Sequence, residues 1–143
     1  MTIISPSSPS HSSHLISTNG VRAQKIWHHP EPLFESTVNE LIDIYEMHSN
    51  ECCGFIDDEQ NVYRIDNVHK YPRMNFFMEE EDVEETIYEI YEIKQSSVLG
   101  IFHTHPNGYP WPSPRDIVGW PNPKLGWRYF LVTFEGVSEW ELV

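Results

Sequence analysis

The stretch from residue 98 to residue 106 constrains the fold of this chain more than any other segment. It reads Val-Leu-Gly-Ile-Phe and then continues without a break into His103-Thr104-His105-Pro106. A continuous apolar run of this length is typical of a central strand that is buried on both faces of a sheet. Because side chains alternate along a strand, His103 and His105 point to one face and Thr104 to the other. The sequence therefore predicts a pair of imidazoles at the carboxyl end of a core strand.

Two imidazoles on one face are suited to bind a metal ion. A catalytic zinc ion usually has three protein ligands and keeps a fourth position for water, so one further donor is needed. Asp116 is the nearest well-placed candidate, and it lies in the segment Ser113-Pro-Arg-Asp116. That segment is also a good helix start, with Ser113 as N-cap, proline at the first helical position and an acid at the third. Taken by itself this second explanation is sufficient, but its conjunction with the histidine pair favours a zinc site formed by His103, His105 and Asp116.

Proton transfer in such a site needs an acid–base group in addition to the zinc ligands. Zinc lowers the pKa of its bound water to about 7, yet a carboxylate normally takes the proton and returns it to the leaving amine. Among the 22 acidic residues, Glu51 stands out because it opens the apolar run Glu-Cys-Cys-Gly-Phe-Ile. The alternative explanation for Glu51, a solvated acid at the edge of a strand, fits the pattern equally well.

Regular apolar patterns on either side of the histidine strand predict an α/β domain. Residues 33–48 and 79–95 carry apolar side chains at helical spacing, and the second of these helices begins with Glu-Glu-Glu-Asp. Two short apolar runs separated by polar residues predict a β-hairpin over residues 51–68. Residues 129–134 and 137–143 predict a second hairpin at the carboxyl end of the chain.

Residues 1–25 differ in composition from the rest of the chain. They include the series Ser-Pro-Ser-Ser-Pro-Ser-His-Ser-Ser-His, which contains too few apolar side chains to offset the entropy of ordering. We therefore expect a flexible tail over residues 1–25, able to dock an assembly partner, and one folded domain over residues 26–143. His11 and His14 have a spacing that metal ions accept, but histidines in a serine-rich segment are more often solvated.

Composition excludes several classes of function. A length of 143 residues fits one domain, and a net charge of −13 argues against a nucleic-acid partner. The chain has no basic residue before His11 and no sustained apolar run, so neither a secretory signal nor a membrane span is expected. The adjacent Cys52 and Cys53 bridge poorly and are interpreted as small apolar side chains in a buried strand. A reducing, cytoplasmic environment is therefore expected.

These motifs resemble those of the JAMM, or MPN-plus, zinc metalloproteases. The pattern of that family is a glutamate, a long gap, His-[Ser/Thr]-His-Pro, and then a serine and an aspartate at fixed spacing. The chain contains the same series: Glu51, His103, Thr104, His105, Pro106, Ser113 and Asp116. The order of expected helices and strands over residues 26–143 is also similar. The resemblance implies an α/β fold with a mixed sheet flanked by helices, of the cytidine-deaminase-like type.

The resemblance also implies a mechanism. His103, His105 and Asp116 would bind one catalytic zinc ion, Glu51 would serve as general base and acid for the metal-bound water, and Ser113 would stabilise the oxyanion. The implied enzyme is a metallopeptidase that cleaves a peptide or isopeptide bond in an extended tail, as at the C-terminus of a ubiquitin-like protein or of a self-encoded precursor. The alternative is a non-catalytic scaffold, or a phage tail-assembly component that would be virion-associated. Zinc content and cleavage assays separate these alternatives.

Two features set the chain apart from larger members of that family. The segment after Asp116 is interrupted by glycines and prolines, so a helix that begins at Ser113 must be short. The chain is also too compact for the inserted segments with which eukaryotic deubiquitinating relatives hold a second ubiquitin, so linkage-specific chain cleavage is not expected. A nucleoside deaminase would need a Pro-Cys-x-x-Cys ligand pair, which two adjacent cysteines cannot supply.

Overall fold

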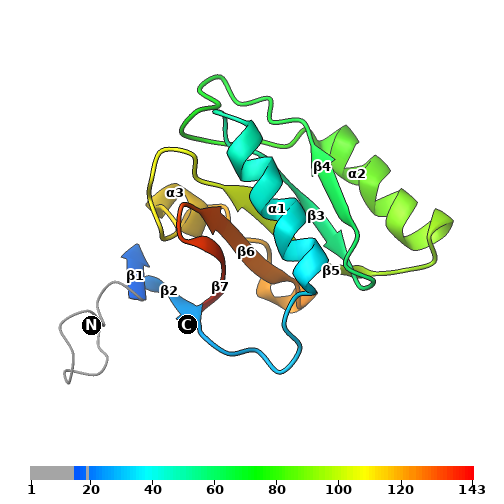
Figure 1. Ribbon diagram of the computed structural model, residues 1–143, viewed down its shortest axis with the longest axis horizontal. Helices are drawn as coiled ribbons and strands as arrows, with labels where there is room; N and C mark the ends of the chain where they lie inside the picture. Colours follow the sequence, from blue (N-terminus) through cyan, green and yellow to red (C-terminus); the bar gives the residue numbers. More distant parts are fainter. Residues whose placement is uncertain (1–14, 19) are drawn as a thin grey trace.

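A mixed sheet runs through the computed structural model, which describes residues 15–18 and 20–143 (Figure 1). The sheet has seven strands in the order β1-β2-β7-β6-β5-β3-β4. The pair β5 and β6 is parallel, and the other neighbouring pairs are antiparallel. The strands are β1 Leu15–Thr18, β2 Val21–Ile26, β3 Cys53–Asp57, β4 Val62–Ile65, β5 Val98–Thr104, β6 Arg128–Thr133 and β7 Gly136–Leu142. The expected α/β class, with a mixed sheet flanked by helices, is confirmed.

Two longer helices and two short ones connect the strands. The helices are α1 Glu35–Met47, α2 Glu80–Tyr88 and α3 Pro114–Val118, with a 3-10 turn η3 over Pro123–Leu125. The helix expected over residues 79–95 forms, but its last turn is the π-helix η2, Glu89–Ile93. In that turn the backbone N–H of Lys94 donates to the carbonyl of Glu89, at 2.8 Å. The short α3 agrees with the prediction from the glycines and prolines that follow it.

The two faces of the sheet form two separate apolar layers. Side chains of α1 pack on the face that carries Ile56, Phe102 and Phe130. Side chains of α2, η2 and α3 pack on the opposite face, which carries Phe55 and Ile101. Burial on both faces explains why β5 is a continuous apolar run in the sequence. The strand expected from residues 98 to 102 is therefore confirmed as a central one.

A glycine in β3 allows this close packing around β5. A Cβ atom on Gly54 would overlap the backbone carbonyl of Tyr63 on β4 and would lie 2.9 Å from the ring of Phe102 on β5. No side chain larger than hydrogen fits there unless the strands move apart. The glycine after the two cysteines therefore holds β4, β3 and β5 together, in the part of the sheet that carries the candidate site.

Two strands lie wholly or mostly within residues 1–25, which we expected to form a flexible tail. Strand β2, Val21–Ile26, pairs with β7 through Ala23 opposite Leu142, and Ala23 is fully buried. Strand β1 then pairs with β2 at the edge of the sheet. Composition alone did not reveal this, because an edge strand is held largely by backbone hydrogen bonds that any sequence can make.

The remaining part of the expected tail, residues 1–14 with His11 and His14, lies outside the described residues, and so does its expected role in docking. Within the described residues no helix combines the length and the apolar character needed to cross a membrane.

Candidate metal centre

The two histidines lie where β5 ends, on the face of the sheet that also carries Ile101 and Tyr129. Their exposed fractions are 0% for His103 and 3% for His105, and their Nε2 atoms lie 3.1 Å apart. The backbone N–H of His105 donates to the carbonyl of Val132 on β6 and so extends the parallel ladder beyond the last residue of β5. The predicted same-face pair at the end of a core strand is confirmed.

Asp116 reaches the same point from α3. Its Oδ2 atom lies 3.1 Å from Nε2 of His103 and 3.0 Å from Nε2 of His105. Ser113 and Asp116 form a capping box, in which the Ser113 hydroxyl accepts from the Asp116 N–H and the Asp116 carboxylate accepts from the Ser113 N–H. The two explanations of this segment are thus compatible, since the helix cap is what holds the carboxylate against the imidazoles.

The three donor atoms form a nearly equilateral triangle with sides of 3.0–3.1 Å. In a tetrahedral zinc site with metal–ligand distances near 2.1 Å, neighbouring donor atoms lie roughly 3.4 Å apart. The triangle therefore has about the size of one face of a zinc coordination tetrahedron. Two imidazole nitrogens and one carboxylate oxygen are also a donor set that zinc commonly takes.

Hydrogen bonding assigns the tautomer of His105. Its Nδ1 lies 3.0 Å from the backbone carbonyl of Tyr109. A carbonyl only accepts, so Nδ1 carries the hydrogen and the neutral ring keeps a lone pair on Nε2, as a metal ligand requires. His103 is positioned by rings instead, since Phe76 stacks on it at 4.6 Å and Tyr129 meets it edge-on at 5.5 Å.

Electrostatics at the centre favour a cation among the three donors. Burial lowers the pKa of His103. Burial would also lower the pKa of His105, but the hydrogen bond and the charge of Asp116 outweigh it, so the pKa of His105 is raised. Burial would raise the pKa of Asp116, yet the two imidazoles hold it well below its usual range. The carboxylate thus stays ionised in a buried position, which is costly unless a proton or a metal ion compensates it.

Glu51 lies across the strand pair from the histidines. Cys53 on β3 is opposite His103 on β5, and continuing this register places Glu51 opposite His105. Ligand atoms of Glu51, His103 and His105 all lie within 4.8 Å of one another. The exposed fraction of Glu51 is 4%, so a solvated acid at a strand edge is not what the structure contains.

The carboxyl group of Glu51 is unsatisfied in this arrangement. Its Oε1 atom is buried without a hydrogen-bond partner among the described residues. Burial raises its pKa to about 8, an effect that His105 opposes and Asp116 strengthens. A buried carboxyl group without a partner, next to three convergent donors, suits a group that would bind a metal-held water molecule.

Thr104 connects Glu51 to the histidine strand. Its hydroxyl accepts from the backbone N–H of Cys52 at 2.8 Å, and its own N–H donates to the Cys52 carbonyl at 2.9 Å. The two bonds hold the residue after Glu51 against the residue between the two histidines. Cys52 and Cys53 themselves are buried free thiols, as the strand pattern predicted.

The side chain of Asn67 helps to hold the backbone of Glu51 in place. This residue was not identified from the sequence. Its Nδ2 donates to the backbone carbonyls of Glu51 and Asn75 at 2.9 Å, and to that of Pro72 at 3.3 Å. Its Oδ1 accepts from the N–H of Phe77 at 3.0 Å, and also from that of His69. One amide thus ties the loop between β4 and α2 to Glu51. An asparagine in a polar loop carries no sequence signal for such a role.

Ser113 keeps a free donor beside the centre. Its oxygen accepts from the Asp116 N–H at 3.1 Å, so the hydroxyl hydrogen is not used in the cap. The structure therefore brings together Glu51, His103, His105, Ser113 and Asp116, the five residues proposed from the sequence. It leaves the Ser113 hydroxyl able to donate to an oxygen bound at the centre.

Comparison with known proteins gives a family match for this chain. A family model described as prokaryotic homologs of the JAB domain matches residues 35–143. No curated protein matches the chain. Among solved structures, a solution structure of a protein from Desulfitobacterium hafniense is similar at 20% identity and a TM-score of 0.49, covering 75% of this chain and 87% of that one.

Proposed function

Because the chain belongs to the family of prokaryotic JAB-domain homologs, we propose that it is a zinc metallopeptidase that hydrolyses peptide or isopeptide bonds. In this proposal His103, His105 and Asp116 hold one catalytic zinc ion. The observation that carries it is the triangle of buried donor atoms, 3.0–3.1 Å apart, beside the unpartnered carboxyl group of Glu51.

Each residue has a distinct part in the proposed reaction. When bound by these residues, zinc would supply a Lewis acid that acidifies water and polarises the scissile carbonyl. Glu51 takes a proton from the attacking water and returns it to the leaving nitrogen, a cycle that a carboxyl group with a pKa near neutral can perform. The hydroxyl of Ser113 donates to the carbonyl oxygen as negative charge develops on it. The carbonyl of Tyr109 keeps His105 in the tautomer that binds metal.

The substrate that fits this site is a protein or peptide tail in extended conformation. A cavity of about 500 Å³, lined by Asp116, Tyr129 and Phe76, borders the centre. An extended tail that reaches the centre would lie in this cavity. The C-terminal tail of a ubiquitin-like protein, or of a precursor encoded with this chain, has this form. The buried free thiols of Cys52 and Cys53 fit a cytoplasmic protein.

The test combines metal content with cleavage. The purified protein is expected to contain one zinc ion per chain and to cleave at least one member of a panel of ubiquitin-like and precursor fusions. Chelation should abolish cleavage, and Glu51→Gln should retain zinc while losing turnover. Cleavage by a zinc-loaded Glu51→Gln protein would contradict the role of Glu51. A full zinc complement with no cleavage across the panel would instead support a non-catalytic scaffold, including a role in phage tail assembly.

A further inference from the structure

An apolar cavity of about 500 Å³ lies on the face of the sheet that carries the two histidines. Phe55 on β3, Ile101 on β5 and Tyr129 on β6 form its floor, and the strand register places these three residues side by side. Ile101 comes two residues before His103, so their side chains point to the same face of β5. The floor of the cavity therefore leads along β5 to the metal centre.

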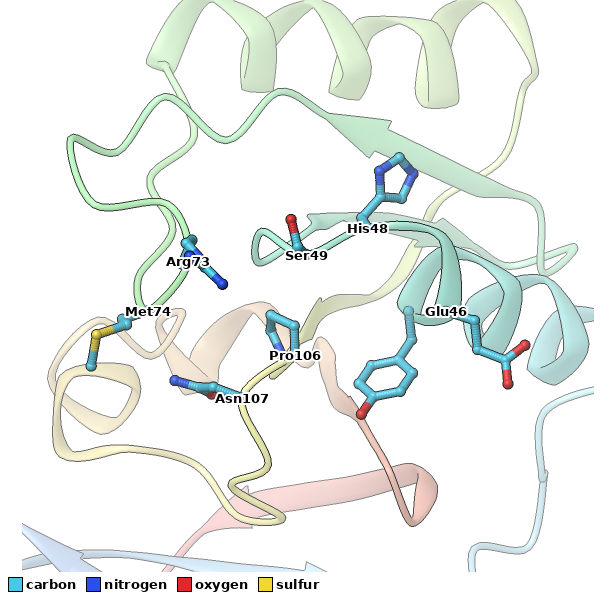
Figure 2. Close-up of a pocket in the computed structure, with 8 residues that line it drawn as sticks. Glu46, His48, Ser49, Arg73, Met74, Pro106 and Asn107 are labelled. Atoms are coloured by element: carbon cyan, nitrogen blue, oxygen red, sulfur yellow. The ribbon is translucent and has the colours of Figure 1, made fainter.

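Three of the residues that line this cavity also form or contact the metal centre. One of them, Asp116, is a proposed ligand. Phe76 stacks on the ring of His103 at 4.6 Å, and Tyr129 meets the same ring edge-on at 5.5 Å. The cavity drawn in Figure 2, of about 640 Å³, differs in this respect, because none of the five candidate residues lines it. A group that enters the first cavity thus lies directly beside the proposed ligands.

The walls of this cavity are largely apolar. Met78 and Val83 line it from the start of α2, and Trp127 lines it where its ring meets Phe55 edge-on at 5.5 Å. Methionine is flexible and adapts its shape to the group that it contacts. A cavity of this size and lining is typical of sites that bind small apolar groups. An aromatic side chain, which buries roughly 150–250 Å² of surface, suits such a site.

Two hydrogen-bond donors meet at the edge of the cavity. Nδ1 of His69 accepts from the N–H of Tyr71 at 2.9 Å, so Nε2 carries the hydrogen of the neutral ring. This Nε2 lies 3.4 Å from a guanidinium nitrogen of Arg115, which can only donate. Both residues line the cavity. Two donors that face each other need a shared acceptor, and the backbone carbonyl of a peptide supplies one. The edge of the cavity thus favours a peptide as the occupant.

If the proposed function holds, the scissile carbonyl of the substrate lies at the metal centre. A carbonyl bound there lies beside Asp116, which also lines the cavity. The residue that carries this carbonyl, or the one that follows it, can therefore place its side chain in the cavity.

We propose that this cavity binds a large apolar side chain, aromatic or long aliphatic, of a substrate residue adjacent to the scissile bond. This inference rests on the proposed function and specifies the sequence that the site selects. The preferred substrate is then a tail with a large apolar residue at the cleavage point, in place of one with glycine on both sides of the bond.

A peptide library tests the proposal by turnover. The zinc-loaded protein is incubated with extended peptides of randomised sequence, and the cleaved bonds are located by mass spectrometry. One position next to the cleaved bond should be occupied by Phe, Trp, Leu or Met. In a matched pair of peptides, replacement of this residue by glycine should lower kcat/KM at least about 100-fold, because a pocket of this kind discriminates by the apolar groups that fill it.

Val83→Phe tests whether this cavity causes the preference. The larger ring would fill the cavity from α2, so the difference between the two matched peptides should disappear while zinc stays bound. Ile87→Phe is the matched control. Ile87 lies one turn later on α2 and is also half-buried, but it does not line the cavity. The control variant should keep the preference for the apolar residue.

The outcomes separate this proposal from the function on which it rests. Cleavage without any preference for apolar residues next to the bond would overturn the role of the cavity and leave the peptidase intact. A preference that persists in Val83→Phe would do the same. Absence of cleavage of every peptide would count against the peptidase itself, and the cavity would then be judged by binding alone.

Binding without turnover gives this second readout. Methyl resonances of Ile101 and Met78 are followed by NMR while N-acetylphenylalaninamide or N-acetylglycinamide is added, with zinc and after chelation. The phenylalanine compound should shift both signals with a Kd in the millimolar range, and the glycine compound should not. The exposed Met47, which does not line the cavity, serves as the internal control. Unchanged signals of Ile101 and Met78, or equal responses to the two compounds, would overturn the proposal whether or not any peptide is cleaved.

Discussion

The two halves of the candidate site are held in different ways. The half that contains His103, His105 and Asp116 comes from one short stretch of chain, in which β5 brings the two histidines to one face and the helix cap of α3 holds Asp116. The half that contains Glu51 is positioned by residues far away in the sequence. Thr104 holds the residue after Glu51, and Asn67 holds its carbonyl.

This difference predicts that zinc binding and turnover can be lost separately. Ligands that are fixed locally should keep their geometry when distant loops change, so metal binding should tolerate changes in the β4–α2 loop that leave Phe76 stacked on His103. Glu51 should shift whenever its distant supports are removed, because no nearby backbone turn or cap fixes its carboxyl group. Substitutions in the second half should therefore lower turnover while zinc stays bound.

The largest expected effect is the loss of zinc affinity in Asp116→Asn, a change in the half that contains the proposed ligands. This change keeps the size of the side chain and an oxygen for the helix cap, but it removes the charge that the two imidazoles share. Zinc affinity, measured by competition with a chelator, should fall by more than about 100-fold, beyond the loss typical of residues that only support a ligand. The exposed Asp58→Asn is the charge-matched control and should bind zinc normally. Unchanged affinity of Asp116→Asn would remove Asp116 from the ligand set.

Ser113→Ala should lower kcat by about 100-fold and keep zinc bound, because it removes the donor proposed for the oxyanion. It should also lower the free energy of unfolding by about 1 kcal/mol, since the N-cap of α3 is lost. Ser113→Thr retains a hydroxyl and should keep most of both properties. Full turnover of Ser113→Ala would limit Ser113 to a capping role.

Thr104→Val tests the connection between the two halves. It leaves the buried N–H of Cys52 without its acceptor, which should cost about 1–3 kcal/mol of unfolding free energy. Turnover should fall more than zinc affinity, because Glu51 loses the bond that aligns it with β5. Thr133→Val is the matched control, since Thr133 is a buried strand threonine whose hydroxyl accepts from the N–H of Glu135. Equal loss of turnover in both variants would show that stability alone is responsible.

Asn67→Asp should have the smallest effect of this series. The carboxylate cannot donate to the carbonyls of Glu51 and Pro72, so the loop should loosen and kcat should fall by about 10-fold at full zinc occupancy. Asn122→Asp is the isosteric control, because the Asn122 side chain accepts from the Lys124 N–H and aspartate can do the same. Loss of zinc from Asn67→Asp would contradict the separation of the two halves.

The sequence pointed to all five candidate residues, but local patterns supported some of them more strongly than others. The alternation along β5 and the Ser-Pro-Arg-Asp helix start are short-range patterns, so the placement of His103, His105 and Asp116 could be argued from spacing. Glu51 remained balanced between a site residue and a solvated acid. Its burial became evident only when β3 and β5 were aligned in the structure.

A central strand and a strand near the edge of the sheet show the same limit. The apolar run of β5 predicted a central strand correctly, because burial on both faces leaves a strong compositional signal. The segment Val21–Ile26 was assigned to a flexible tail, although it pairs with β7. Backbone pairing near the edge of a sheet needs few apolar side chains, so composition missed this strand.

By itself the sequence determined the types of its central elements and the series of zinc-ligand candidates, because helical and strand periodicity and helix caps act over a few residues. Only the tertiary structure decided that Glu51 lies opposite His105 and that Asn67 supports it. These relations depend on strand register and on the path of a long loop. Both are set by packing between segments that are distant in the chain, which no local pattern encodes.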